Sequence, residues 1–349
     1  MSGEILALNF DSMSSPSIKL KADESSKASK TPGRGVGWYP NDEHGASLVK
    51  DAMAHDTQAL LNTFKDGTSF RSTHFMCKMR GEGKEYTQHN TQPFRRSLGG
   101  YDWLFLHNGH LDRAALSKLH SDPSGLMEPV GDTDSELAFC FLLGKLLAES
   151  SKGLADIKGH EIFTWMKTLD ELGASDFVFT DGRSLAVYHG KNSERDLYFH
   201  RMLPSEEPPV FESDLVSLSL EDPRDSLRTL FLVSSFQLDE ATFQPMEPGR
   251  LIIVRRGAVH WDSLPADTKT KEAATIDENI LIENEEVEKA TELFVSQQQE
   301  QSQTSAQMVA EEPTTTESFS NIINIKSLTH ASDGVPLEYR SYDISHLTE

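Results

Sequence analysis

The sequence predicts an α+β fold built on antiparallel sheets. Short runs of aliphatic and aromatic residues, typical of buried strands, recur through the first three quarters of the chain. They are mixed with a few helical segments and do not alternate strictly with them, as they would in a parallel α/β sheet. Asp181-Gly182 and Pro248-Gly249 lie between or before such runs, where the chain needs turns.

Composition narrows the class of protein. The chain has 349 residues, and its 33 basic and 55 acidic residues give a formal charge of −22. This charge argues against nucleic acid or an anionic membrane as a partner, because basic patches supply most of that affinity. The N-terminus has no basic segment, and no window approaches the ~18 apolar residues of a membrane span, so we expect a cytoplasmic, unexported protein.

The sequence indicates neither a cofactor nor a metal. Cys77 and Cys140 are the only cysteines and form no CxxC pair, which argues against a disulfide framework or a zinc site. The 13 histidines include no HExxH motif. Both cysteines lie among apolar residues, where packing is the expected role.

The first elements can be placed in order. A strand over residues 4–10 begins almost at the first residue, which suggests that the terminus is held in the core or near a site. Residues 12–34 are rich in Ser, Lys and Pro and predict an exposed loop. Residues 33–40 predict a glycine turn leading into an aromatic strand. Residues 51–64 have helical spacing, and residues 71–80 alternate as a strand with Arg80 at its end.

A buried strand over residues 103–108 ends in Asn108-Gly109, and two interpretations are open for this pair. Asn-Gly is a strong signal for a tight hairpin turn, because both residues tolerate positive φ. A buried strand can also deliver an amide side chain and an unhindered backbone N–H to a cleft, as an oxyanion hole requires. These residues alone do not decide between the two.

The remaining elements follow the same rules. Thr133 and Glu136 fit a capping box that begins an apolar helix over residues 137–148, with Asp134 in its first turn, where an acidic group also stabilises the helix dipole. A second helix is predicted over residues 160–172. Further strands are predicted over residues 176–180, 184–189, 229–234 and 250–255.

Composition changes near residue 262. We expect one domain over residues 1–262 and an acidic, Gln- and Thr-rich linker over residues 263–318 that is too polar to offset its ordering entropy. Residues 319–349 predict short strands, either packed on the main domain or part of an incomplete module.

The joint order of these motifs resembles the class II glutamine amidotransferases. The resemblance rests on a strand at the extreme N-terminus, residues 35–39, Arg80, the Pro-Phe turn at residues 90–94, the strand ending in His-Asn-Gly, and the Thr-Asp-Ser-Glu helix start. It is closest to the stand-alone amidotransferases of that family. It covers roughly the first three quarters of the chain.

The resemblance implies an N-terminal-nucleophile hydrolase fold, a four-layer αββα sandwich with two antiparallel sheets. In the family, the N-terminal residue attacks the side-chain amide of glutamine and its own α-amino group acts as base. Carried over by position, Asn108 and the Gly109 N–H would form the oxyanion hole, Arg80 would bind the substrate carboxylate, and Asp134 would bind its ammonium group.

The sequence departs from the family at the nucleophile. The usual Met-Cys start is here Met1-Ser2, with Gly3 inserted before the strand. Lys78 and Gln92 stand where histidine is usual. Ser2 is small enough to permit removal of Met1 and can attack in principle, but a hydroxyl is a much weaker acid than a thiol.

Two functions therefore remain open. The first is an amidohydrolase of low or altered activity that acts on glutamine or a γ-glutamyl amide through Ser2. The second is a non-catalytic relative that binds an amino-acid-like ligand or a partner protein in the inherited pocket. With no synthetase domain in this sequence, transfer of ammonia would need a separate acceptor enzyme.

Overall fold

The structure, a computed structural model, describes residues 3–20, 33–52, 70–79, 87–120, 124–204, 210–212, 216–220, 224–225, 227–238 and 242–264. All of them fall in one compact unit, residues 1–272. No helix within these ranges is long and apolar enough to cross a membrane. The predicted linker and C-terminal strands lie almost wholly outside the described residues, so those domain boundaries stay predictions.

The first large sheet is built around the N-terminal strand. Its order is β14-β10-β13-β1-β5-β3-β4, and its neighbouring strands pair antiparallel. The strands are β1 (Glu4–Ser14), β3 (Arg34–Trp38), β4 (Ser47–Asp51), β5 (Ser72–Met79), β10 (Tyr198–Met202), β13 (Leu230–Ser234) and β14 (Gln244–Pro245). β1 lies between β13 and β5, so the start of the chain is central to the sheet.

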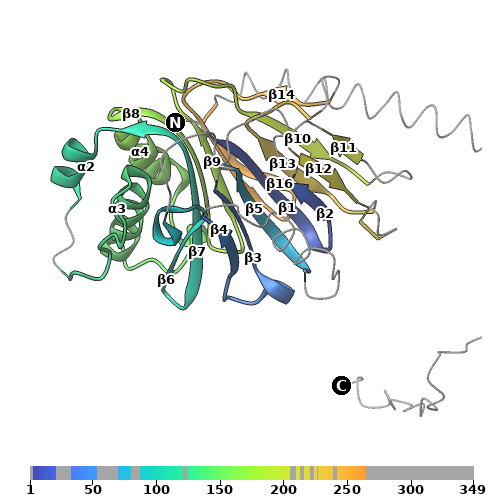
Figure 1. Cartoon of the computed structure of the whole chain (residues 1–349), viewed down its shortest axis with the longest axis horizontal. Coiled ribbons are helices and arrows are strands. Elements are labelled where there is room, and N and C mark those ends of the chain that lie inside the picture. The colour runs from blue at the N-terminus through green and yellow to red at the C-terminus, as the bar shows by residue number, and fades with distance from the viewer. Residues whose placement is uncertain are drawn as a thin grey trace, which may run out of the picture. The chain divides into compact units, whose positions relative to one another are not determined.

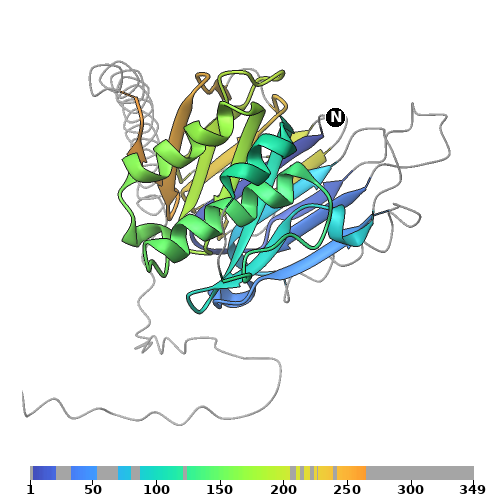
Figure 2. The same ribbon diagram turned by 90° about the vertical axis from the view of Figure 1, so that its left-hand side faces the viewer.

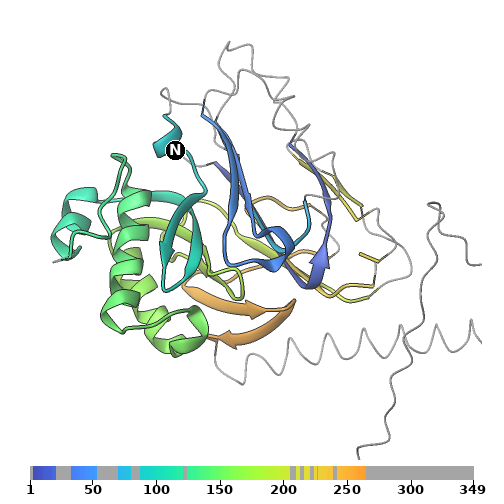
Figure 3. The same cartoon turned by 90° about the horizontal axis from the view of Figure 1, so that it is seen from below.

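The second large sheet is also antiparallel, in the order β16-β15-β9-β8-β7-β6. Its strands are β6 (Phe94–Leu98), β7 (Tyr101–Leu111), β8 (Gly173–Thr180), β9 (Leu185–His189), β15 (Arg250–Arg255) and β16 (Ala258–Asp262). Figure 3 shows the layers, with the helices, the sheet that contains β7, and the sheet that contains β1 and β3 in succession.

The helices cover one face of the β7 sheet (Figure 2). They are α2 (Arg113–Leu119), α3 (Asp134–Ala148) and α4 (Gly159–Asp170). The Phe139 ring of α3 stacks on Phe105 of β7 with 5.2 Å between centroids. Burial of an aromatic side chain of this size stabilises the fold by roughly 1.5–3 kcal/mol, so such contacts anchor the helical layer to the sheet.

A small three-stranded sheet packs on the outer face of the β1 sheet (Figure 1). It contains β2 (Ser17–Leu20), β11 (Val210–Glu212) and β12 (Val216–Ser219). Ile18, Val216 and Leu218 join the apolar cluster formed by Leu6, Leu8 and other residues of that face. The α+β sandwich with two antiparallel sheets is confirmed. A second helical layer is not seen among the described residues, and the predicted helix over residues 51–64 lies mostly outside them.

Two local predictions were wrong, and one open alternative is excluded. Residues 12–34 are not simply an exposed loop, because β1 continues to Ser14, β2 pairs with β12 some 200 residues later, and Arg34 is buried in β3. Gly35 and Gly37 lie within β3, and only Gly33 precedes it, so these glycines do not form a turn before the strand. Of the two interpretations open for Asn108-Gly109, the tight hairpin turn is excluded, since β7 runs on to Leu111.

The prediction of a capping box at α3 is correct for one of its two hydrogen bonds. Thr133 Oγ1 accepts the Glu136 N–H at 3.1 Å, as predicted. The Glu136 carboxylate does not return to the Thr133 N–H, and accepts instead from the Val130 and Gly131 N–H groups and from Arg96. Glu136 thereby holds the loop before α3.

Candidate active site

Polar side chains gather at one end of the interface between the two large sheets. The facing strands bury alternate apolar residues such as Leu106, Val178 and Val187 against Ile5 and Ala7 of β1. At the end of each strand the same face becomes polar. The residues of this polar row are neighbours on successive strands of one sheet: Asn108, Asp176, His189 and Arg250.

The opposite sheet contributes three residues at the same end. Gly3 precedes β1, Lys78 lies near the end of β5, and Ser235 follows β13, each continuing the inward face of its strand. Ser235 Oγ accepts the Ile5 N–H at 2.8 Å and donates to Glu4 at 2.7 Å. Burying a polar group costs free energy unless the group is hydrogen-bonded, and these bonds allow polar side chains to be buried at this end of the interface.

Asn108 joins the two sheets. Its side chain is buried, and Oδ1 accepts the Gly3 N–H at 2.9 Å and the Lys78 ammonium at 3.0 Å. Both neighbours can only donate, so the amide oxygen must face them. Nδ2 therefore turns the other way, and within the described part of the chain it donates to no protein acceptor.

Gly109 needs to be glycine. Its φ is +139°, and a Cβ there would lie 2.0 Å from the Ala174 carbonyl oxygen of β8. Along β7, the His107 N–H is bound by Gln92 Oε1 at 2.7 Å and the Leu111 N–H by Asp134 Oδ2 at 2.7 Å. Because alternate residues of a strand direct N–H groups to the same edge, we expect the Gly109 N–H to lie between these two on that edge.

Asp134 fixes the start of α3 against the end of β7. Its Oδ2 accepts the Leu111 N–H and lies 3.3 Å from Nδ1 of the exposed His110, while Oδ1 accepts the Ser135 N–H. A carboxylate has about four lone-pair sites, so these contacts leave room for one further donor. Asp134 and Gly109 thus belong to one edge of the site.

His107 supports this edge from the other face of the sheet. Its Nδ1 lies 2.8 Å from Ser135 Oγ, and the ring is fully enclosed against Phe177. Burial lowers the pKa of His107 to about 4; nearby Asp134 opposes this shift and Lys78 reinforces it. The imidazole is therefore neutral near pH 7 and acts as scaffold.

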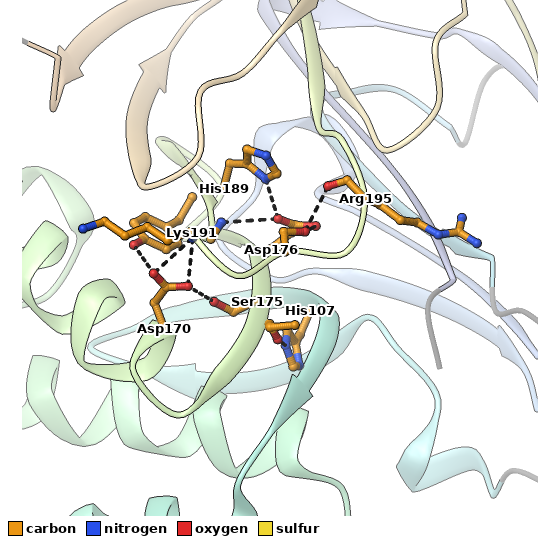
Figure 4. Close-up of polar contacts among 11 residues, drawn as sticks. His107, Asp170, Ser175, Asp176, His189, Lys191 and Arg195 are labelled. Atoms are coloured by element: carbon orange, nitrogen blue, oxygen red, sulfur yellow. Dashed lines mark hydrogen bonds and ion pairs between the residues drawn. The ribbon is translucent and has the colours of Figure 1, made fainter.

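A buried carboxylate and imidazole form the part of the site that the sequence did not predict. Asp176 Oδ1 accepts from His189 Nδ1 at 2.7 Å (Figure 4). Asp176 Oδ2 accepts from Ser193 Oγ at 2.8 Å. The exposed fractions of the two partner side chains are 1% for Asp176 and 3% for His189.

A local signal for this pair existed in the sequence. β8 and β9 flank Asp181-Gly182, and Thr180 pairs with Leu185. Counting four residues outward along each strand of that hairpin brings Asp176 opposite His189.

Two hollows open beside the polar row. The smaller is lined by Asn108, Gly109, His110, Asp176 and the segment 193–195. The larger, of about 420 Å³, is lined by His189, the same segment and residues of β10 and the turn after β13. The two hollows therefore adjoin along the segment 193–195.

Comparison with known proteins identifies the family. The model of the family described as "Glutamine amidotransferases class-II" matches residues 1–278, which is most of the chain. This protein belongs to the class II glutamine amidotransferases. The predicted resemblance is confirmed.

The chain is similar to several known proteins. It is 25% identical to an uncharacterized protein of Methanocaldococcus jannaschii over 74% of this chain and 71% of that protein. It is 36% identical to the putative glutamine amidotransferase YafJ of Escherichia coli, over 31% of this chain and 41% of that protein. A predicted glutamine amidotransferase from Pseudomonas aeruginosa PA01 has a similar fold, with a TM-score of 0.58, 19% identity, and coverage of 74% of this chain and 99% of that structure.

The predicted site residues of this class II amidotransferase can now be placed. Asn108 and Gly109 lie near the end of β7, where Asp134 accepts the Leu111 N–H, and their catalytic and binding roles stay predictions. Ser2 and Arg80 lie outside the described residues, so their roles stay predictions. Lys78, one of the two departures from the family pattern, contacts Asn108 directly, and Gln92, the other, holds the His107 N–H.

Neither cysteine of this amidotransferase replaces the missing thiol at residue 2. Both are buried, and burial raises the pKa of Cys77 to about 12 and that of Cys140 to about 11. A thiol nucleophile needs the opposite shift, toward a thiolate near neutral pH. Both cysteines pack in apolar clusters, as predicted.

Proposed function

We propose that this protein is an amidohydrolase that acts on glutamine or a γ-glutamyl amide, with low activity because serine replaces the usual cysteine. Met1 is removed, Ser2 attacks the amide carbon, and its α-amino group takes the hydroxyl proton. An α-amino group has a pKa near 8 and reaches its own side chain, which suits it to this role.

The observation that carries the proposal is the contact between Asn108 Oδ1 and the Gly3 N–H. Gly3 follows Ser2 directly in the chain, so this contact supports a nucleophile beside the end of β7. It also leaves Asn108 Nδ2 as a donor for the oxyanion, together with the Gly109 N–H. Removing one such donor typically slows turnover by about 10²–10³.

The substrate clamp needs two opposite charges. The spare lone-pair site of Asp134 supports its role in binding the substrate ammonium group. Arg80 follows β5 by one residue and would bind the α-carboxylate as a bidentate fork. The ammonia that is released would pass to water or to a separate acceptor enzyme in the cytoplasm.

A second function is favoured by Gly3 itself. The residue whose nitrogen meets Asn108 has no side chain to attack a substrate, and Ser2 lies one position farther out. A nucleophile misplaced by ~1 Å already costs about a hundredfold in rate. On this alternative, the protein is a non-catalytic relative that binds an amino-acid-like ligand or a partner protein.

The mass of the native N-terminus is the first test. The proposal expects intact mass spectrometry to show a chain that begins at Ser2. Retention of Met1 would block the α-amino base and exclude the Ser2 mechanism.

Ammonia release from glutamine is the second test. We expect wild type to release ammonia slowly and Ser2→Ala to release none above background. Ser2→Cys combined with deletion of Gly3 restores the family's start, and we expect about a hundredfold faster release. Equal rates in wild type and Ser2→Ala would exclude Ser2. Binding of glutamine without turnover, lost in Arg80→Ala and Asp134→Ala, would support the second function.

A further inference from the structure

The larger hollow adjoins the oxyanion side of the site without containing Asn108 or Gly109. Ser193, Glu194 and Arg195 line both hollows, so the larger hollow adjoins the smaller one that Asn108 and Gly109 border. A space of about 420 Å³ can hold a small organic molecule. This arrangement suits a second reactant.

His189 presents a reactive nitrogen to that space. The Asp176 carboxylate only accepts hydrogen bonds, so Nδ1 carries the hydrogen and Nε2 of the neutral ring holds the lone pair. Nε2 has no partner among the described residues, although the ring is 97% buried and lines the hollow. A buried carboxylate that orients an imidazole in this way also stabilises the cation formed when Nε2 takes a proton.

The charged side chains that line the larger hollow indicate which kind of molecule it would bind. Arg195 is paired with Glu4, and its side chain extends away from Asp176 and His189 (Figure 4). Asp196 accepts from the Tyr198 hydroxyl at 3.2 Å. Glu194 is exposed and forms no hydrogen bond or ion pair within the described ranges. The lining therefore offers an available carboxylate and an available base, which together suit an ammonium group.

We propose that this hollow binds a small primary amine as an acyl acceptor, with Glu194 holding the ammonium group and His189 acting as its base. This inference rests on the proposed function for the origin of the acyl group. It assigns the protein a transfer reaction, in which a γ-glutamyl group passes from glutamine to an amine, in addition to hydrolysis.

The step balances without a further reactant. The bound ammonium gives one proton to His189 Nε2 and becomes a neutral amine. Its nitrogen attacks the carbonyl carbon of the Ser2 ester, so a C–N bond forms while the bond to Ser2 Oγ breaks. Oγ takes the second proton of the amine through the α-amino group, and His189 returns its proton to solvent. The products are a substituted γ-glutamyl amide and free Ser2.

Binding is tested first, in a protein that cannot turn over. Ethylamine is titrated into full-length Ser2→Ala protein carrying ¹⁵N-labelled histidine, and the ring signals are followed by NMR. We expect a saturable shift of His189 Nε2. Adding Glu194→Gln should weaken binding by about tenfold, the loss expected for one charge-assisted contact. Glu149→Gln, an exposed carboxylate next to α3, is the matched control and should leave the titration unchanged. No shift of His189, or equal curves for the Glu194 variant and its parent, would overturn the inference.

Transfer is tested in the protein with Ser2 intact. With glutamine and ethylamine together, mass spectrometry should detect γ-glutamylethylamide, and His189→Gln should reduce its ratio to released ammonia by at least tenfold. Ammonia release with no change in that ratio would overturn the inference and leave the proposed function standing. If no ammonia is released at all, the proposed function fails, and the binding titration still decides what the hollow takes.

Discussion

His107 and His189 are both buried in strands of the same sheet, yet they face opposite ways and have different partners. His107 points toward the helices and contacts the neutral hydroxyl of Ser135. His189 points toward the opposite sheet and contacts the Asp176 carboxylate. Two residues of one type, at the same end of one sheet, are thus placed in different electrostatic settings.

The different partners give the two histidines different roles: His107 supports the structure, and His189 is placed for a chemical role. A buried imidazole with only neutral hydrogen-bond partners resists protonation, because nothing compensates the loss of hydration of the cation. A carboxylate partner supplies that compensation and also fixes the tautomer. The sandwich therefore holds a rigid, neutral histidine behind Asn108 and Gly109, and beside the larger hollow a histidine whose tautomer the Asp176 carboxylate fixes.

The largest effect predicted from the comparison of His107 with His189 is on the free energy of unfolding. Phenylalanine keeps most of the ring volume but no nitrogen. His189→Phe leaves a buried carboxylate without its main partner, and we expect a loss of about 3–5 kcal/mol in the free energy of unfolding. His107→Phe removes the ring partner of the Ser135 hydroxyl and the 3.4 Å contact with the Ala174 carbonyl oxygen, both neutral, and we expect about 1–3 kcal/mol. Urea unfolding of both variants measures the difference, and equal losses would contradict the distinction between the partners.

The next prediction concerns acid. Unfolded His107 binds a proton near pH 6.5, whereas the folded protein holds it neutral down to about pH 4. Between these values the unfolded state binds more protons, so stability falls as the pH falls, by ~3 kcal/mol for this group. His107→Gln cannot titrate and should flatten this part of the curve. Burial also lowers the pKa of His74, to about 3, and since His74 is present in both proteins its contribution cancels. Unfolding measured from pH 7 to 4 checks this, and parallel curves would count against it.

Local features of this fold could be predicted because near neighbours determine them. The Thr133 cap depends on residues three positions apart, and the buried strands alternate within a few residues. β2 was missed for the opposite reason. Its residues, Ser17–Leu20, do alternate polar and apolar, but a run of four within a Ser-, Lys- and Pro-rich stretch is a weak signal, and the strand forms by pairing with β12.

The contacts of the candidate site also divide into those that the sequence could predict and those that it could not. The contact between Asn108 and Gly3 joins residues 105 positions apart, so only a family resemblance could suggest it. Lys78 reaches Asn108 from the other sheet, which strand alternation alone does not predict. The pairing of Asp176 with His189 was within reach of the sequence, because a short hairpin fixes its register, but it required counting outward from the turn.

The smallest predicted effect concerns the serine hydroxyls beside the two histidines. Ser135 contacts His107, and Ser193 donates to Asp176. Ser135→Ala and Ser193→Ala should each cost about 1 kcal/mol in unfolding free energy, the net value of one hydrogen bond. Only Ser193 borders the two hollows, so only Ser193→Ala should change the ratio of γ-glutamylethylamide to ammonia. Urea unfolding and product analysis together separate the two roles: a changed ratio in Ser135→Ala would show that the region behind β7 is not merely scaffold.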